Sequence, residues 1–395
     1  MTSNFETGAA SPSRAPAPVL ALGFRLFYLL AGAYAAISVG LWALQFAGWL
    51  PAPALVYGPL WHAHEMLFGY AFAVIAGFLF TAVKNWANRP TPTGMPLALL
   101  GALWVAARVL SFTPWRAGST LMDVAFTLGV AAGIAKPLLA SGNRRNYFFI
   151  ALVLAIAAAN VAFQAGIAGW TDYPPQRALW LAADAVMFAI AVVAGRVVPM
   201  FTNNALKSMG ARRVQTIEYA ALGSILALAA CDLAGLAAAA GIVAAFAAAA
   251  HGARLALWSP LATRRTPLLW ILHLSYAWLV AHLALRSAAA FGYATPSLAM
   301  HALTVGAIGG MTLGMMTRSA LGHTGRPLTA GRAEIASYVL VQLAAAARVL
   351  VPLVFPAAYP ASVTAAGVLW FTAYAVFTAA YWPRLTRPRV DGRPG

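Results

Sequence analysis

Charged residues are scarce in this 395-residue sequence: they make up 9% of the chain, whereas hydrophobic residues make up 62%. Soluble globular proteins contain about 25% charged and about 45–50% apolar residues. Apolar runs of about 20 residues, enough to cross a hydrocarbon core of roughly 30 Å as a helix, recur along the whole chain. The sequence therefore predicts an all-α integral membrane protein, with no segment left for a sizeable soluble domain.

Cysteine is almost absent as well. The single cysteine, Cys231, excludes an intramolecular disulfide and a C-x-x-C-H motif for covalent haem attachment. A haem in this protein would therefore be held without a covalent link, as haem b.

Twelve apolar segments separated by short polar loops predict a single bundle of transmembrane helices. The domain interpretation is a disordered tail at 1–22, a transmembrane domain at 23–383 and a basic tail at 384–395. The first apolar run is too long for a signal peptide, so we expect an uncleaved protein of the bacterial inner membrane. The predicted spans are 24–47, 59–84, 96–112, 119–139, 147–168, 176–202, 215–235, 237–257, 267–290, 296–317, 333–351 and 361–382.

The formal net charge of +17 follows the membrane topology. If both chain ends are cytoplasmic, most of the 26 Lys and Arg residues fall on the inner side, as the positive-inside rule requires. The basic excess therefore predicts contact with the lipid bilayer and no nucleic-acid partner. Whether the protein forms a homo-oligomer is left open. The exceptions are Arg108, Arg116, Arg177, Arg196, Arg286 and Arg348.

Ionisable groups at membrane depth cost roughly 2.5–3.5 kcal/mol each on insertion scales, so each needs a partner or a function. The topology places His62, His64 and His301 together in the outer third. His62 and His64 lie about 200° apart around a regular helix, so they should face different neighbours unless the first turn unwinds. Glu65 shares a face with His62 and could orient its ring. Other such groups are Asp123, Asp184, Arg196, His251, His273 and His282, where Asp123 could simply pair with Arg108.

The segment 300–318, "MHALTVGAIGGMTLGMMTR", carries four glycines and a methionine pair. Gly306, Gly309, Gly310 and Gly314 could admit a flat macrocycle or a closely packed helix. Met311 and Met315 could offer soft ligands to Cu(I) or simply fill the core.

Arginines gather on the predicted cytoplasmic side. Arg196, Arg318 and Arg326 could together bind a carboxylate or phosphate, such as a haem propionate or an anionic substrate, or serve only to set the topology. Asn203 offers an amide nearby. His323 lies between glycines in "LGHTG", which topology does not explain.

Four stretches together resemble the NnrS family of polytopic membrane proteins: "WHAHEMLFGYAFAVIAGFLFTAVKNW", "GRVVPMFTNN", "LLWILHLSYAW" and "MHALTVGAIGGMTLGMMTRSALGHTGRPL". The resemblance implies a twelve-helix inner-membrane protein with haem and copper that acts in defence against nitric oxide and nitrosative stress. It departs from the family pattern in "NWANRP" and "LHLSYAW", where Thr-Gly and Gly-Tyr are expected. By resemblance, the candidate haem or copper ligands are His62, His64, His273, His301 and His323, with Arg196, Asn203, Tyr276, Arg318 and Arg326 in support.

The leading hypothesis is a protein that binds haem b and copper and takes part in nitric oxide metabolism or protection. Nitric oxide, or another small diatomic ligand, is uncharged and could reach a site within the bilayer without a polar channel. Whether the protein turns nitric oxide over is left open. The alternatives are an ion-coupled secondary transporter built on Asp184 and Arg196, and a non-catalytic assembly or stability factor for a membrane metalloenzyme.

Overall fold

The computed structural model describes residues 16–51, 58–207 and 210–393. Most of the predicted tail at 1–22 lies outside these ranges. All regular secondary structure in the described residues is helical, which confirms the all-α prediction. The α-helices are α1 Gly23–Phe46, α2 Pro59–His64, α3 Phe72–Ala87, α4 Met95–Leu110, α5 Arg116–Ala140, α6 Phe148–Ile167, α7 Pro175–Ala205, α8 Gln215–Leu233, α9 Ala237–Ala256, α10 Pro267–Ala290, α11 Pro296–His301, α12 Gly310–His323, α13 Arg332–Val354 and α14 Tyr359–Thr386.

Two of the long helices are interrupted by π-helical segments. The segment η2, Glu65–Ala71, joins α2 to α3, and η5, Ala302–Gly309, joins α11 to α12. Each composite helix begins with a proline, whose fixed φ suits the first helical turn. A π segment holds extra residues per turn and re-aims the side chains around it, and such segments are frequent at functional sites. Short 3₁₀ turns complete the chain: η1 Pro18–Leu20, η3 Arg144–Asn146, η4 Pro260–Thr263 and η6 Pro356–Ala358.

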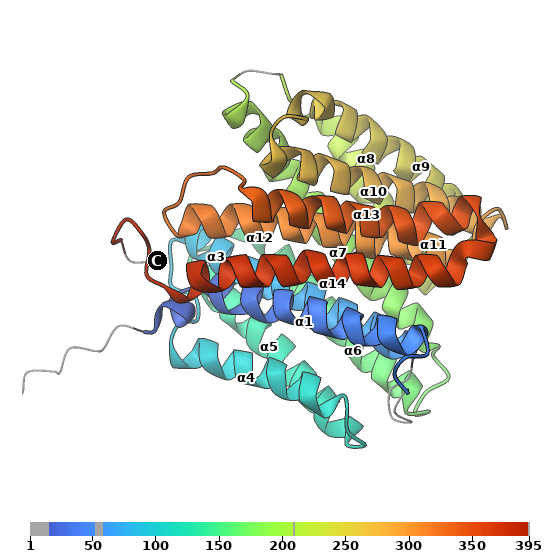
Figure 1. The fold of residues 1–395 in the computed structure, drawn as a ribbon, viewed down its shortest axis with the longest axis horizontal. Helices are drawn as coiled ribbons and strands as arrows, with labels where there is room; N and C mark the ends of the chain where they lie inside the picture. Colours follow the sequence, from blue (N-terminus) through green and yellow to red (C-terminus); the bar gives the residue numbers. More distant parts are fainter. Residues whose placement is uncertain (1–15, 52–57, 208–209, 394–395) are drawn as a thin grey trace, which may run out of the picture.

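Both ends of the described chain lie at one end of the bundle, which we call the terminal end (Figure 1). Arg25 in α1 donates hydrogen bonds to the carbonyls of Leu385 and Arg387, at 3.1 and 2.8 Å. We call the opposite end, where α11 begins, the distal end. Because the chain starts and finishes at the same end, it must traverse the bundle an even number of times.

The structure supports eleven of the twelve predicted spans by length and hydropathy. The exception is α4, which was expected to span the membrane over 96–112. It has 16 residues and a length of about 24 Å, short of the roughly 30 Å hydrocarbon core. Gly94, just before α4, donates to the carbonyl of Leu20 at the terminal end, and Ser111, just after it, accepts a hydrogen bond from Trp61 of α2 near the distal end. Helix α4 is therefore the remaining traverse of the bundle, but a short one.

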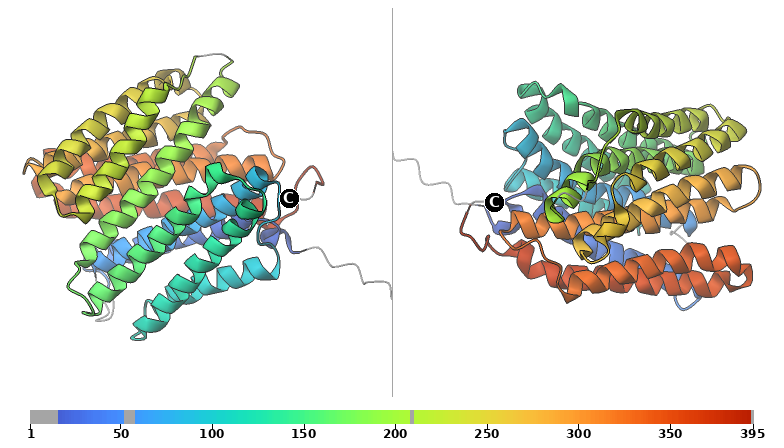
Figure 2. Two further views of the ribbon diagram at one scale, coloured as in Figure 1. Left: turned by 180° about the vertical axis from the view of Figure 1, so that it is seen from behind. Right: turned by 90° about the horizontal axis from the view of Figure 1, so that it is seen from above.

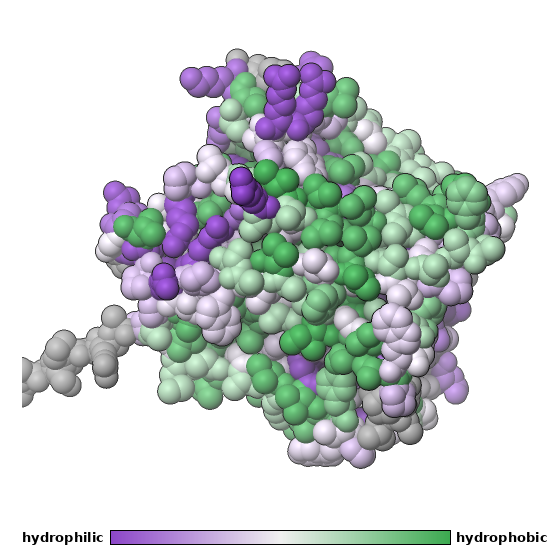
Figure 3. Space-filling view, viewed as in Figure 1, coloured by the Kyte–Doolittle hydropathy of each residue, from purple (hydrophilic) through white to green (hydrophobic). Residues whose placement is uncertain are grey.

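The helices form two lobes with the first and last helices between them. Helices α8, α9 and α10 lie on one side, α4, α5 and α6 on the other, and α1 packs against α3 and α14 in the middle (Figures 1 and 2). Hydrophilic residues gather toward the terminal end, and the face over the middle of the bundle is largely apolar (Figure 3). This pattern agrees with a multi-pass membrane protein; which end faces the cytoplasm stays a prediction.

The glycines of η5 and α12 serve helix packing rather than a macrocycle. A Cβ at any of these four positions would lie closer than 3.0 Å to a neighbouring side chain. The obstructing side chains belong to α10, α13 and α14, so these helices pack directly onto the glycine surface. Of the two alternatives that the sequence left open, the structure thus supports close helix packing. The contacts are Gly306 with Trp278, Gly309 with Trp370, Gly310 with Ser275 and Gly314 with Ile271.

Candidate functional site

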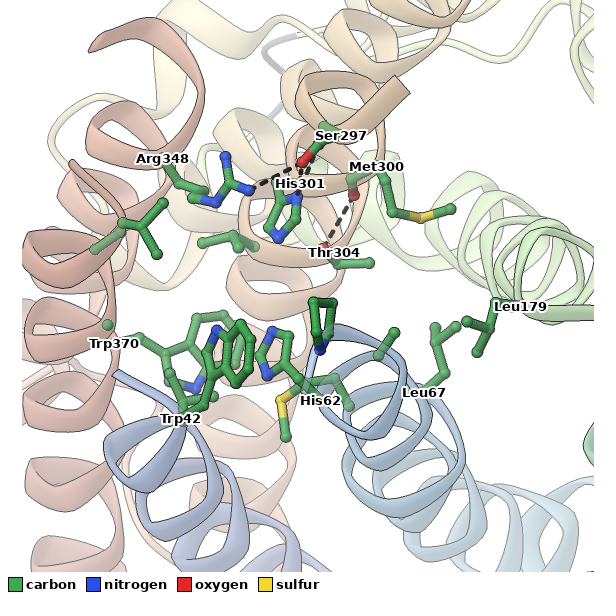
Figure 4. A pocket seen from close by; sticks show the side chains of 18 of the residues that line it. Trp42, His62, Leu67, Leu179, Ser297, Met300, His301, Thr304, Arg348 and Trp370 are labelled. Atoms are coloured by element: carbon green, nitrogen blue, oxygen red, sulfur yellow. Dashed lines mark hydrogen bonds between the residues drawn. The ribbon is translucent and has the colours of Figure 1, made fainter. Parts of the chain in front are cut away.

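A cavity of about 380 Å³ lies at the distal end of the bundle (Figure 4). Its size is within the range of small-molecule and cofactor sites, about 300–1,000 Å³. Helices α1, α2, α7, α11, α13 and α14 and the two π segments supply its walls. The walls are mostly apolar, but His62, His301, Arg348 and Ser297 also face it.

His62 presents an unsatisfied ring nitrogen at this cavity. Its Nδ1 is buried and has no hydrogen-bond partner among the described residues. The ring is stacked on Trp42 of α1, with centroids 5.1 Å apart and planes inclined by 14°. This stacking fixes the orientation of the imidazole without using either nitrogen.

His301 faces the same cavity from a different helix, and its ring points into the space from the side opposite His62 (Figure 4). Its Nδ1 lies 2.7 Å from the carbonyl oxygen of Ser297, one turn earlier. A carbonyl only accepts, so Nδ1 carries the proton and the neutral ring keeps its lone pair on Nε2. That nitrogen has no hydrogen bond from the described residues. A backbone carbonyl holding one ring nitrogen is the usual arrangement behind a metal-ligating histidine.

His64 points away from the cavity. Its Nδ1 lies 2.9 Å from Oε1 of Glu65, and its Nε2 lies 3.0 Å from Oδ1 of Asn160. Both ring nitrogens are thus occupied, and the divergence expected for the H-x-H pair is confirmed. The prediction that Glu65 orients His62 is wrong. Glu65 instead contacts the ring of His64 and the guanidinium of Arg108.

Glu65 belongs to a buried ionic cluster between α2, α4 and α5. Arg108 lies 3.0 Å from Glu65, measured from Nε to Oε2, and also pairs with Asp123. Tyr34 donates a further hydrogen bond to Glu65. A Cβ on Gly69 would lie 2.5 Å from Nη1 of Arg108, so glycine is required for this approach. The predicted Asp123–Arg108 pair is confirmed.

His251 and Tyr276 form part of a second buried network, away from the cavity. Tyr276 donates to Nδ1 of His251 at 2.6 Å, and Nε2 of His251 donates to the carbonyl of Ala221 at 2.9 Å. Arg254 donates to Tyr276 at 2.8 Å and makes a bidentate pair with Glu218. Every polar group of this network has a partner, which is typical of a structural role.

His273 is also occupied by the protein itself. Its Nδ1 lies 3.0 Å from the carbonyl of Leu269, and its Nε2 lies 3.3 Å from the carbonyl of Trp258 and 3.4 Å from Thr202. It does not line the distal cavity. The structure therefore separates His273 from His62 and His301.

The arginines predicted to bind one anion make separate contacts. Arg196 donates to Oδ1 of Asn146 at 2.8 Å, and the guanidinium of Arg318 lies 3.9 Å from the ring centroid of Phe201. Asp184 and Arg196, the residues on which the transporter alternative was built, each contact a different partner. Asp184 instead pairs with Arg286 at 2.7 Å.

The remaining predicted residues lie at the terminal end. His323 ends α12, where its carbonyl accepts a hydrogen bond from Arg389 at 2.7 Å. Arg326 follows in the loop, where burial and the nearby Arg384 lower its pKa. Asn203 bonds through both amide atoms to the backbone of Ala211, at 2.8 and 3.0 Å, and so closes the turn after α7.

Met311 and Met315 line a separate cavity of about 70 Å³. Its walls are almost wholly apolar, and no His, Cys, Asp or Glu faces it. In addition, the described residues contain no group of three or more His, Cys, Asp or Glu side chains that could hold a metal ion. The methionine pair thus fits core packing better than a copper centre.

Sequence reasoning missed one residue near the distal end and left another, His282, without a specific role. Arg348 of α13 was counted only as an exception to the charge asymmetry, although a lone arginine within an apolar helix was the available signal. His282 of α10 donates from Nδ1 to the carbonyl of Ala299 at 2.7 Å, and its Nε2 is buried without a partner. His282 stacks on Trp180, which lines the cavity.

The family comparison covers every helix that lines the cavity. A family model described as NnrS protein matches residues 18–389, which is nearly the whole chain. The chain belongs to the NnrS family. This membership supports a membrane protein of the nitric oxide response, and it agrees with the resemblance carried by the four sequence motifs. No curated protein matches the chain.

Proposed function

We propose that this NnrS-family protein binds haem b in the distal cavity, with His62 and His301 as ligands to the iron. One observation carries the proposal. Two histidines from two different helices each present a ring nitrogen without a protein partner to the same apolar cavity. His64, His251 and His273 instead have protein partners at both ring nitrogens. His282 keeps an unpartnered Nε2 but does not line this space.

The donor set suits a b-type haem. With no cysteine near the cavity and no covalent attachment motif, imidazole is the available axial ligand. Trp42 fixes the plane of His62, while the Ser297 carbonyl fixes the tautomer of His301 and leaves Nε2 free. A haem iron held by both imidazoles would have no vacant position, so a diatomic ligand such as nitric oxide would bind only in place of one of the two histidines.

Copper has weaker support. A separate copper site would need further imidazoles, and the described residues offer no metal-binding group of three or more side chains. Copper would therefore have to occupy the same cavity, where Met66 and Met300 add thioethers suited to Cu(I). We accordingly rank haem b first.

The proposed role is nitric oxide metabolism or protection against nitrosative stress in the bacterial inner membrane. Nitric oxide dissolves in lipid and can reach a cavity inside a helix bundle from the bilayer. The transporter alternative has less support, because Asp184 is paired with Arg286 and Arg196 is bonded to Asn146. An assembly factor for another metalloenzyme would use the same fold.

The decisive experiment is spectroscopic. Full-length protein, purified in detergent from cells supplied with haem precursor and copper, is expected to show a Soret band and about one haem per chain by pyridine haemochromogen assay. Anaerobic nitric oxide should shift that band. Protein with neither haem nor copper would refute the proposal, and co-purification of a partner metalloenzyme with such protein would favour the assembly factor.

A further inference from the structure

Arg348 is a buried cation at the wall of the distal cavity. It is 6% exposed, lies on α13 and adjoins Ser297 and His301 (Figure 4). Its Nη2 donates to Oγ of Ser297 at 3.0 Å and to the hydroxyl of Tyr359 at 3.4 Å. Its Nη1 has no hydrogen-bond partner among the described residues.

No carboxylate among the described residues pairs with Arg348. The sequence has nine Asp and Glu residues, and nearly all of them form ion pairs with other arginines. Of the rest, Asp172 is exposed in a loop and makes no ion pair, and Glu6 lies outside the described residues. The acidic residues that already form ion pairs are Glu65, Asp123, Asp184, Glu218, Asp232, Glu334 and Asp391.

An unpaired guanidinium at membrane depth is costly, and neutral hydroxyls compensate its charge only in part. The planar fork of arginine matches the two oxygens of a carboxylate. Next to Arg348, the cavity holds nitrogen donors that would bind a metal. The site therefore fits a ligand with three properties: a metal ion, an apolar body around it, and a negatively charged group at its edge.

We propose that Arg348, together with Ser297, binds a carboxylate-type oxyanion within the distal cavity. The oxyanion is a propionate of the haem, and this assignment rests on the function proposed above. The propionate edge of the haem would then face α13. A free small anion has the same chemistry, and the experiment separates the two sources.

The first measurement compares haem b with its dimethyl ester, in which both propionates are esterified. Haem-free full-length protein is titrated with each by absorption. Because one charge-assisted bidentate pair is lost, the wild type should bind haem b about 10- to 100-fold more tightly than the ester. Arg348→Met should bind haem b only as tightly as the ester. A wild-type ratio near one, or an unchanged ratio in Arg348→Met, would overturn the propionate assignment.

Two variants serve as controls. Arg177→Met removes an exposed cation at the same end of the bundle and should keep the wild-type ratio. Arg348→Lys keeps the charge without the fork and should give an intermediate ratio. If Arg348→Met fails to fold, as judged by its melting temperature, Arg348→Lys and the wild-type ratio still decide the assignment.

The second measurement needs no haem. Millimolar acetate should raise the melting temperature of haem-free wild type and not that of Arg348→Met. A shift of this kind with equal affinity for haem b and its ester would assign the site to a free anion and overturn the propionate source. If neither porphyrin binds the wild type, the proposed function fails, and the absence of an acetate shift would then refute the anion site as well.

Discussion

The distal half of the molecule holds two sites that contain histidine, the cavity and the ionic cluster. They differ in which polar atoms have no hydrogen-bond partner. At the cavity, His62 and His301 each keep a free ring nitrogen, and Arg348 keeps a free Nη1. In the ionic cluster, both nitrogens of His64 are bonded, to Glu65 and to Asn160. The two sites thus hold the same residue type and differ in hydrogen-bond satisfaction, and under the proposed function only the unsatisfied nitrogens bind a ligand.

The largest effect is expected from breaking the ionic cluster. Arg108→Leu leaves Glu65 and Asp123 buried without their shared cation, which should cost about 3–5 kcal/mol of unfolding free energy. Thermal unfolding in detergent measures this loss. The exposed Arg177→Leu should stay within about 0.5 kcal/mol of wild type. An Arg108→Leu protein as stable as wild type would remove the cluster's structural role.

The cavity histidines should affect cofactor content instead. His301→Ala and His62→Ala should each lower the haem-to-protein ratio at least about tenfold, because each removes an iron ligand, a loss of about 1.4 kcal/mol or more. The melting temperature of the haem-free chain should change little. Haem content equal to wild type in both variants would reject the ligand assignment while leaving the family membership intact.

His64 tests the contrast directly. His64→Ala leaves acceptors on Glu65 and Asn160 unpaired, so it should reduce stability by about 1–3 kcal/mol and leave the haem content of the folded fraction unchanged. Haem quantification alongside thermal unfolding gives both numbers. Loss of haem from a fully stable variant would mean that His64, not its neighbours, is the ligand.

The smallest effect concerns the support of His62. Trp42→Leu removes the stacked ring, a contact of about 0.5–1.5 kcal/mol, and should weaken haem binding by up to about tenfold. Trp49, near the end of α1 and 72% exposed, offers the matched control Trp49→Leu. Equal haem affinity in the two variants would show that Trp42 does not position the histidine.

The candidate site could be predicted from sequence only in part. Helical spacing correctly separated His62 from His64, and matched depth placed His62 near His301. The partner of Glu65 was predicted wrongly. Glu65 and His62 share a helix face, but the sequence does not show that Arg108 of α4 lies beside Glu65. Arg348 was not singled out, because only the tertiary structure shows that the described acidic residues pair with other arginines. The glycines of η5 and α12 were ambiguous until Trp278 and Trp370 were seen against them.

Composition alone determined that this protein is a helical membrane bundle, because an apolar run of sufficient length has few alternatives to a helix in lipid. The sequence motifs determined the family. Tertiary structure decided which polar side chains are satisfied by one another and which are left for a ligand. That outcome depends on contacts between helices far apart in the chain, such as α2, α11 and α13, and no local pattern records them.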